Sequence, residues 1–256
     1  MTSPHPQPAS ASGPLPSADL PSADLPSAVL PSAVLWDMDG TIVDTEPYWI
    51  AAEAPLVEEH GGSWTHQDAL QLVGLSLDAS ARILQDAGVR LTVDEIIATL
   101  SARVVAMCAE RGVPFRPGAL EMLHDLRAAG VKTGLVTMSY RHMALSIVEL
   151  IGFQAFDVVI AGDDARRPKP HPDPYLQAAE ALGVDIAHTV AIEDSPNGLR
   201  SAIASGAVAL GVPNILPLDG IGAHALWPTL EGRTAADLGA LHVAHHTTAA
   251  VHGDAR

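Results

Sequence analysis

The chain has 256 residues and a mass of 26.6 kDa, which suits one large domain or one domain carrying an insertion. Fourteen basic and thirty acidic residues give a net charge of −16, and this field repels polyanions, so we expect no nucleic-acid partner. No apolar run approaches the roughly 18 residues that span a bilayer, so we expect no membrane partner.

Charge distribution and cysteine content bear on the compartment. No Lys or Arg precedes Arg82, whereas the same stretch holds eleven Asp and Glu residues. Secretory and mitochondrial targeting segments need early positive charge, so none is expected. Cys108 is the only cysteine, which excludes an internal disulfide and fits a reducing cytosol. We therefore expect a cytoplasmic protein that is a monomer or weak oligomer.

The first 33 residues are rich in Pro, Ser and Ala, and from Pro16 they repeat as PSADL, PSADL, PSAVL and PSAVL. Such a Pro-spaced tract cannot pack a core, so residues 1–33 are predicted to be a disordered arm. The last repeat runs into Ala33-Val34-Leu35-Trp36, a β-prone run that ends at the acidic segment 37–41. This pattern predicts a strand followed by a turn.

No convincing strand lies between Tyr48 and Arg111. Apolar residues recur at helical spacing over 76–87 and 92–110, and both stretches end near a glycine. Residues 47–115 are therefore predicted to form an all-helical insert, in which Pro55 kinks or divides the first helix. Trp49 is interpreted as part of the core of this insert.

After the insert, strands and helices alternate regularly. Short apolar runs predict strands at 131–136, 157–161, 189–192 and 207–210, and helical patterns lie between them at 140–150, 173–182 and 196–204. Strands separated by helices predict an α/β fold with a doubly wound, Rossmann-like parallel sheet. Its core would comprise residues 34–46 and 116–238.

The pattern weakens after Gly211. Residues 239–256 carry His242, His245, His246 and His252 among small residues. We predict a flexible tail, because a solvated histidine-containing tail is favoured over an adventitious metal site.

Acidic residues follow two of the predicted strands. Asp37 and Asp39 lie two residues apart, so an extended chain points both to one side, at the edge where open parallel sheets bind ligands. Two close carboxylates repel each other, and a divalent cation relieves that repulsion. Glu193 and Asp194 end another strand, and carboxylate oxygens suit Mg²⁺ rather than zinc. For Asp194 alone, capping of the next helix is an equally good interpretation.

Two other residues are candidates for holding a phosphate. Only two lysines are present, and Lys169 lies between prolines before a predicted helix, where a cation is well placed for an anion. The other, Lys132, precedes a strand as a solvated flank. Thr137 ends a strand at the same sheet edge, where its hydroxyl and neighbouring amides can bind phosphate oxygens, although threonine is common at strand ends.

Together these elements resemble the haloacid dehalogenase superfamily of aspartate-nucleophile phosphotransferases. The first family motif matches Asp37-Met38-Asp39-Gly40-Thr41, and its continuation matches at 43–47. Thr137 matches the second motif, Lys169 the third, and Glu193-Asp194 the fourth. The resemblance spans about 34–213.

The resemblance implies a role for each residue. Asp37 would attack phosphorus to give an aspartyl-phosphate, and Asp39 would protonate the leaving oxygen and then deprotonate water. Mg²⁺ would be held by Asp37, the Asp39 backbone carbonyl and Asp194, with Glu193 supporting it directly or through water. Thr137 and Lys169 would hold the transferring group.

The insert resembles the family's small helical cap, which closes over the site. Residues 72–78 resemble the substrate-contacting stretch of the β-phosphoglucomutase branch, but Leu77 stands where that branch typically has arginine. This difference favours a phosphatase for a small monoester, such as a sugar or polyol phosphate, over a phosphomutase. A signalling receiver domain is disfavoured by the insert and by the first-strand position of Asp37. A binding-only relative is disfavoured because every chemical position is filled.

Overall fold

The computed structural model describes residues 29–253, and the side chains as far as Thr247. The predicted disordered arm lies outside the described residues except for 29–33. Of these, Ala33 already belongs to the first strand. Among the described helices, none is long and apolar enough to cross a membrane.

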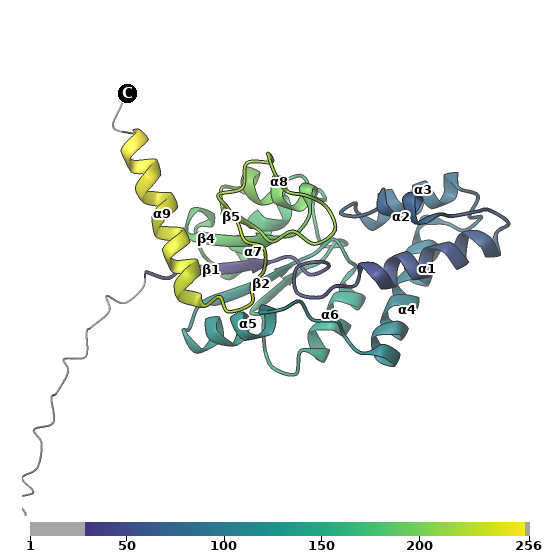
Figure 1. Ribbon diagram of the computed structural model, residues 1–256, viewed down its shortest axis with the longest axis horizontal. Coiled ribbons are helices and arrows are strands. Elements are labelled where there is room, and N and C mark those ends of the chain that lie inside the picture. Colours follow the sequence, from purple (N-terminus) through teal and green to yellow (C-terminus); the bar gives the residue numbers. More distant parts are fainter. Residues whose placement is uncertain (1–28, 254–256) are drawn as a thin grey trace, which may run out of the picture.

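Six described strands form one parallel sheet in the order β3-β2-β1-β4-β5-β6 (Figure 1). Neighbouring strands are parallel throughout, and β1 lies between β2 and β4. The predicted doubly wound α/β sheet is therefore confirmed. The strand β6 was not predicted, since two residues are too few to give a periodic signal. The strands are β1 (Ala33–Trp36), β2 (Lys132–Val136), β3 (Val158–Ile160), β4 (Thr189–Glu193), β5 (Val208–Gly211) and β6 (Ala225–Leu226).

Helices cover both faces of the sheet. The alternation of β1 sends Val34 and Trp36 to one face and Ala33 and Leu35 to the other, and each pair is fully buried. The first pair shares a core with α5, α6 and α9, and the second packs with α7 and α8. These helices are α5 (Ala119–Ala128), α6 (Arg141–Leu150), α7 (Asp173–Leu182), α8 (Pro196–Ser205) and α9 (Ala235–Gly253).

Four helices form the insert, beyond the carboxyl ends of the strands (Figure 1). They are α1 (Glu46–Glu59), α2 (His66–Leu70), α3 (Leu77–Asp86) and α4 (Val93–Arg111). Thr92 and Glu95 form a capping box that starts α4. Pro55 does not divide α1. The next two residues, Leu56 and Val57, are buried in the core, and this packing offsets the cost of the backbone hydrogen bond that proline removes.

The two connections to the insert lie side by side. The Asp44 amide donates to the Pro114 carbonyl over 2.8 Å, and the Arg116 amide donates to the Ile42 carbonyl over 2.8 Å. Val43 and Phe115 form an antiparallel bridge between them. The insert is thus joined to the sheet through one short two-stranded connection.

The prediction of a flexible tail from residue 239 was wrong for the described residues. Ala235–Gly253 form α9, which begins with Thr234 donating from its amide and its hydroxyl to Asp237. The Ala235 amide donates to Asp125 of α5 over 2.6 Å, and Leu238 is fully buried. The small residues that suggested a tail allow the helix to pack closely against the core.

Candidate active site

The carboxyl ends of the strands bring three acidic side chains around one lysine. Lys169 Nζ donates to Asp37 Oδ1 over 2.7 Å, to Glu193 Oε1 over 2.6 Å and to the Val136 carbonyl over 2.9 Å. Asp37, Glu193 and Asp194 each offer a carboxylate oxygen, and these oxygens lie within 4.8 Å of one another. All four charged side chains are buried.

One lysine does not balance three buried carboxylates. Burial raises the pKa of Asp37 to about 8 although Lys169 opposes the shift. Burial, followed by the charges of Asp37 and Glu193, raises the pKa of Asp194 well above its ordinary value. Burial alone would lower the pKa of Lys169. The Asp37 and Glu193 carboxylates outweigh this effect, so the pKa of Lys169 is raised overall. The cluster therefore lacks positive charge, and a divalent cation would supply it.

The turn after β1 comes directly against Asp194. Gly40 has φ of +89°, and a Cβ at this position would lie 2.0 Å from Asp194 Oδ2. Only glycine permits both the backbone conformation and the close approach. The Thr41 hydroxyl donates to Asp194 Oδ1 over 3.4 Å. The turn thus packs Asp194 beside the end of β1.

Asp39 has a different set of partners. Its carboxylate accepts from the hydroxyls of Thr45 (2.5 Å) and Ser139 (2.7 Å), from Trp49 Nε1 (3.3 Å) and from the Thr137 hydroxyl (3.4 Å). The Asp39 carboxylate is absent from the described cluster of three acids. Asp37 and Asp39 therefore line one site but face different neighbours.

Sequence reasoning missed three residues of this site. Trp49 is buried as expected, but its indole N–H also reaches Asp39, across the connection to the insert. Ser139 lies two residues after Thr137 and donates to the same carboxylate. The Tyr175 hydroxyl donates to Glu193 Oε1 over 2.7 Å. The serine had a signal in the hydroxyl-rich end of its strand, whereas the contacts of Trp49 and Tyr175 depend on tertiary structure.

A pocket lies between the insert and the strand ends that carry Asp37, Asp39 and Asp194. Asp37, Asp39, Thr137, Lys169 and Asp194 line its floor. Glu46, Trp49 and Glu53 of α1 line its wall, together with side chains of the loop before α3 and of α4. Across the described residues, Lys169 is the one lysine or arginine in this lining.

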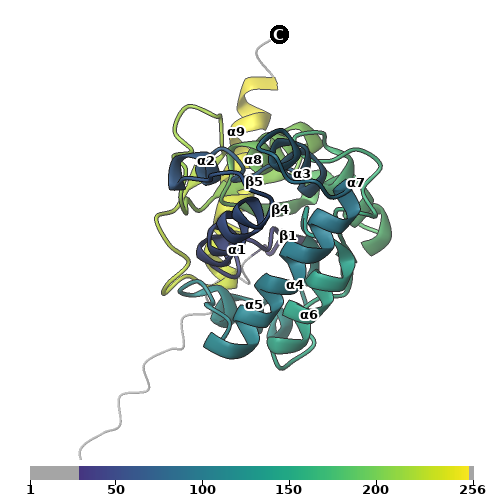
Figure 2. The same ribbon diagram turned by 90° about the vertical axis from the view of Figure 1, so that its right-hand side faces the viewer.

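The insert touches the core on two sides of the pocket. Asn197 Nδ2 at the start of α8 donates to the Gly74 carbonyl over 3.1 Å. The Tyr140 hydroxyl before α6 donates to Asp78 of α3 over 3.3 Å. Viewed from the insert, α1 to α4 lie in front of the strand ends (Figure 2). The insert therefore lies over the pocket and contacts the core beside it.

Comparison with known proteins identifies a family that matches most of the chain. The family model of haloacid dehalogenase-like hydrolases matches residues 34–212. Hexitol phosphatase B of Escherichia coli (strain K12) is 30% identical over 186 residues, which cover 70% of this chain and 82% of that protein.

Two solved structures have the same architecture. CbbY from Rhodobacter sphaeroides, in complex with xylulose-(1,5)bisphosphate, has a TM-score of 0.74 and 27% identity, covering 82% of this chain and 99% of that one. The β-phosphoglucomutase of Clostridium difficile has a TM-score of 0.74 and 21% identity, covering 85% and 100%. The predicted resemblance to the haloacid dehalogenase superfamily is confirmed, and the β-phosphoglucomutase of Clostridium difficile shares the fold.

Proposed function

Since the chain belongs to the haloacid dehalogenase-like hydrolases and is a phosphatase like the relatives it matches, we propose that it hydrolyses the monophosphate ester of a small polyhydroxylated molecule. The observation that carries the proposal is the Lys169–Asp37 contact of 2.7 Å at the floor of a pocket that no other lysine or arginine of the described residues lines. A buried carboxylate beside a lysine is suited to attack a bound phosphate.

The proposed reaction uses two carboxylates in succession. An Asp37 oxygen attacks phosphorus while the bond to the leaving oxygen breaks, and the Asp39 carboxyl gives that oxygen a proton. Asp39 then takes a proton from water, which attacks the phosphorus and releases inorganic phosphate from Asp37. The four donors around Asp39 hold its carboxylate on the pocket side throughout.

Lys169 and Thr137 are proposed to hold the phosphate. The Lys169 ammonium lies at the pocket floor, and Thr137 Oγ1 is fixed by the Ser139 amide, which donates to it over 3.0 Å. Fixed donors of this kind stabilise charge that develops on phosphoryl oxygens without reorganising.

The acidic cluster fits Mg²⁺. Its donors are carboxylate oxygens, and their burial beside a single lysine leaves negative charge uncompensated. Asp37, Asp194 and the Asp39 carbonyl would hold the ion, with Glu193 in support. When bound, it would neutralise charge on the phosphoryl group. Glu193 is already engaged by Lys169 and Tyr175, which favours a supporting role.

The residues in the wall of the pocket support a leaving group that carries hydroxyl groups and no second phosphate. Burial, followed by the charges of neighbouring acids, raises the pKa of Glu46 to about 8, and burial raises that of Glu53 to about 7 although Trp64 donates to it. Such carboxyls are suited to hydrogen-bond hydroxyl groups and disfavour a second phosphate. Leu77 also lines the pocket, so the position that is typically arginine in the mutase branch brings no charge.

The test is release of inorganic phosphate from hexitol, pentitol and sugar monophosphates and matched bisphosphates, with Mg²⁺ or EDTA. We expect Mg²⁺-dependent hydrolysis of monophosphates, lost in Asp37→Asn. Preference for a bisphosphate would contradict the proposed leaving group. Catalytic transfer of phosphate between sugar positions, stimulated by a sugar bisphosphate, would favour the phosphomutase.

We also propose that the enzyme acts in the cytoplasm as a monomer or weak oligomer, without nucleic-acid or membrane partners. The net charge of −16 supports the absence of nucleic-acid and membrane partners, because an acidic protein repels nucleic acid and anionic lipid. Sedimentation at several protein concentrations tests the oligomeric state, and a stable assembly at micromolar concentration would contradict it.

A further inference from the structure

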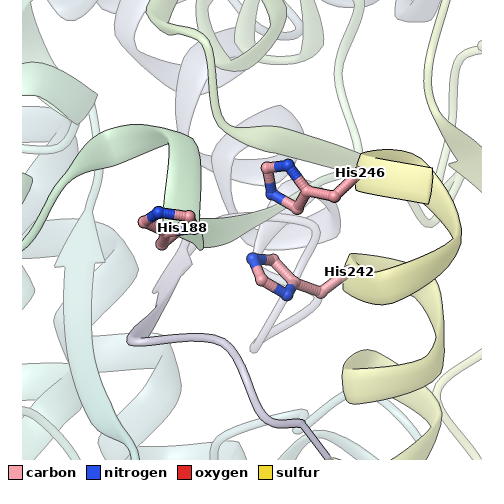
Figure 3. Close-up of side chains that lie close together, drawn as sticks. All are labelled: His188, His242 and His246. Carbon is pink, nitrogen blue, oxygen red and sulfur yellow. The ribbon is translucent and has the colours of Figure 1, made fainter. Parts of the chain in front are cut away.

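Three histidines converge at the end of the molecule opposite the insert. His188 ends the 3₁₀ turn η1 (Ile186–His188) just before β4, and His242 and His246 project from α9 toward it (Figure 3). Each offers a ring nitrogen, and these nitrogens lie within 4.8 Å of one another. The ring centroids of His242 and His246 are 4.6 Å apart. Their i, i+4 spacing places both on one face of the helix.

The two ring nitrogens of His242 have no hydrogen-bond partner in the part of the chain that the structure describes. Its side chain is 6% exposed, and both Nδ1 and Nε2 are buried without a hydrogen bond among the described residues. A buried imidazole that forms no hydrogen bond loses the solvation of two polar atoms, which is unfavourable for both nitrogens. Buried polar groups normally have partners, so this side chain indicates a ligand that supplies one.

The other two histidines provide what a metal site needs. His246 Nε2 lies 2.9 Å from the Ala187 carbonyl, so Nε2 donates and Nδ1 keeps a lone pair. A ligating histidine typically donates its second N–H to a carbonyl in this way. His188 is exposed, which leaves an entry path and a position for water.

We propose that His188, His242 and His246 bind one divalent transition-metal ion, of which Zn²⁺ is the representative, and that the ion fixes α9 to the amino-terminal edge of the sheet. Imidazole nitrogens favour such ions over Mg²⁺. In a tetrahedral site with bonds of about 2.0–2.1 Å, ligand nitrogens lie about 3.3 Å apart, so the three side chains must move closer together than the described 4.8 Å limit to bind the ion.

This site is separate from the acidic cluster. His188 precedes the first residue of β4 and Asp194 follows the last, so a five-residue strand of about 16 Å lies between them. The two sites also differ in ligand atoms. The inference therefore stands or fails independently of the proposed hydrolysis.

The test is zinc binding to the full chain without a polyhistidine tag, measured by competition with a chromophoric chelator in millimolar Mg²⁺. Mg²⁺ occupies the oxygen-ligand cluster and leaves the histidines free. We expect one equivalent of Zn²⁺ to bind, and an absorption spectrum of nitrogen-ligated metal with Co²⁺. Zinc at about 100 times its Kd should raise Tm by roughly 5 °C.

Four variants decide the assignment. His188→Ala and His246→Ala, which change exposed or half-buried side chains, should each weaken zinc binding at least tenfold. His66→Ala, on an exposed helix of the insert, should leave it unchanged. His245→Ala is the closest control, because that ring stacks edge-on against His224 with centroids 4.2 Å apart.

Hydrogen exchange supplies a separate readout of what the ion does. Zinc should slow exchange of amides in α9 of the unaltered chain and not of His246→Ala. The proposal is overturned if no stoichiometric zinc binds, if His188→Ala and His246→Ala bind it as tightly as the unaltered chain, or if only His245→Ala loses it. Zinc binding that leaves amide hydrogen exchange in α9 unchanged would overturn the proposal that the ion fixes α9 to the sheet.

Discussion

Lys169 Nζ and Asp37 Oδ1 lie 2.7 Å apart although 132 residues separate them in the sequence. The same ammonium contacts Glu193, so one cation is shared between the candidate nucleophile and the fourth motif. Because all three groups are buried, removing the lysine would leave carboxylates without compensation, whereas removing one carboxylate relieves repulsion. This asymmetry determines the first prediction.

Lys169→Met should reduce kcat/KM by roughly 10³-fold, because it removes a fixed positive charge beside the transferring phosphoryl group. It should also make the metal-free protein less stable and increase the stabilisation that Mg²⁺ provides. Phosphate release and thermal unfolding with and without Mg²⁺ measure both effects.

The matched control is Lys132→Met. Lys132 is the only other lysine, and it donates to the Leu182 carbonyl away from the pocket. A comparable loss of activity in Lys132→Met would mean that the effect is structural.

Asp39→Asn should separate the two halves of the reaction. An alkyl leaving group needs a proton, so hydrolysis of a polyol phosphate should fall by roughly 10²–10⁴-fold. The p-nitrophenolate ion leaves without a proton, but the aspartyl-phosphate then lacks a base to activate water. Rapid-mixing experiments should therefore release about one equivalent of p-nitrophenolate in a burst, followed by slow turnover. Equal slowing with both substrates and no burst would contradict this role.

Glu53→Gln should change how stability depends on pH. The raised pKa of Glu53, about 7 in the folded chain against 4.5 ordinarily, means that the folded state holds a proton that the unfolded state has lost. The contribution of the Glu53 carboxyl to the free energy of unfolding is fully present below about pH 4.5 and is lost as the pH rises through 7. The decline is on the order of 3 kcal/mol.

Thermal unfolding of the metal-free protein at pH 5 and pH 8 measures this decline. We expect Glu53→Gln to reduce it by the share of Glu53, since glutamine keeps the acceptor for Trp64 Nε1 without a charge, whereas the raised pKa values of Asp37, Glu46 and Asp194 leave a remaining decline. The exposed Glu58 of the same helix supplies the control variant, Glu58→Gln. An equally steep decline in Glu53→Gln would show that the carboxyl is not buried in solution.

The sequence predicts much of the fold and part of the site, for identifiable physical reasons. Asp37, Thr137 and Asp194 each follow an apolar strand, and parallel strands bring their carboxyl ends to one edge. The helix α9 was missed because Ala and His give no clear periodicity, and its position depends on Asp125. The partner of Trp49 also needs three-dimensional contacts.

The candidate histidine site shows the same limit more sharply. His242 and His246 have helical spacing in the sequence, but this spacing is informative only if the segment is a helix. His188 lies far from them in the chain and comes near only because α9 packs beside η1. No local sequence pattern predicts that His188 lies near His242 and His246.

Gly40→Ala should weaken Mg²⁺ binding through the shape of the turn alone. The new Cβ would meet the Asp194 carboxylate at 2.0 Å, so the turn or the carboxylate must move, and the ligands separate. We expect the Mg²⁺ concentration for half-maximal activity to rise at least tenfold.

Gly61→Ala is the matched control, because Gly61 has a similar φ of +84° but open space around a Cβ. Both variants carry the backbone strain of a positive φ, on the order of 1 kcal/mol, and Gly40→Ala should lose further stability because its Cβ displaces the turn or the Asp194 carboxylate. Only Gly40→Ala should require more Mg²⁺, and equal requirements in the two variants would show that contact with Asp194 does not shape the metal site.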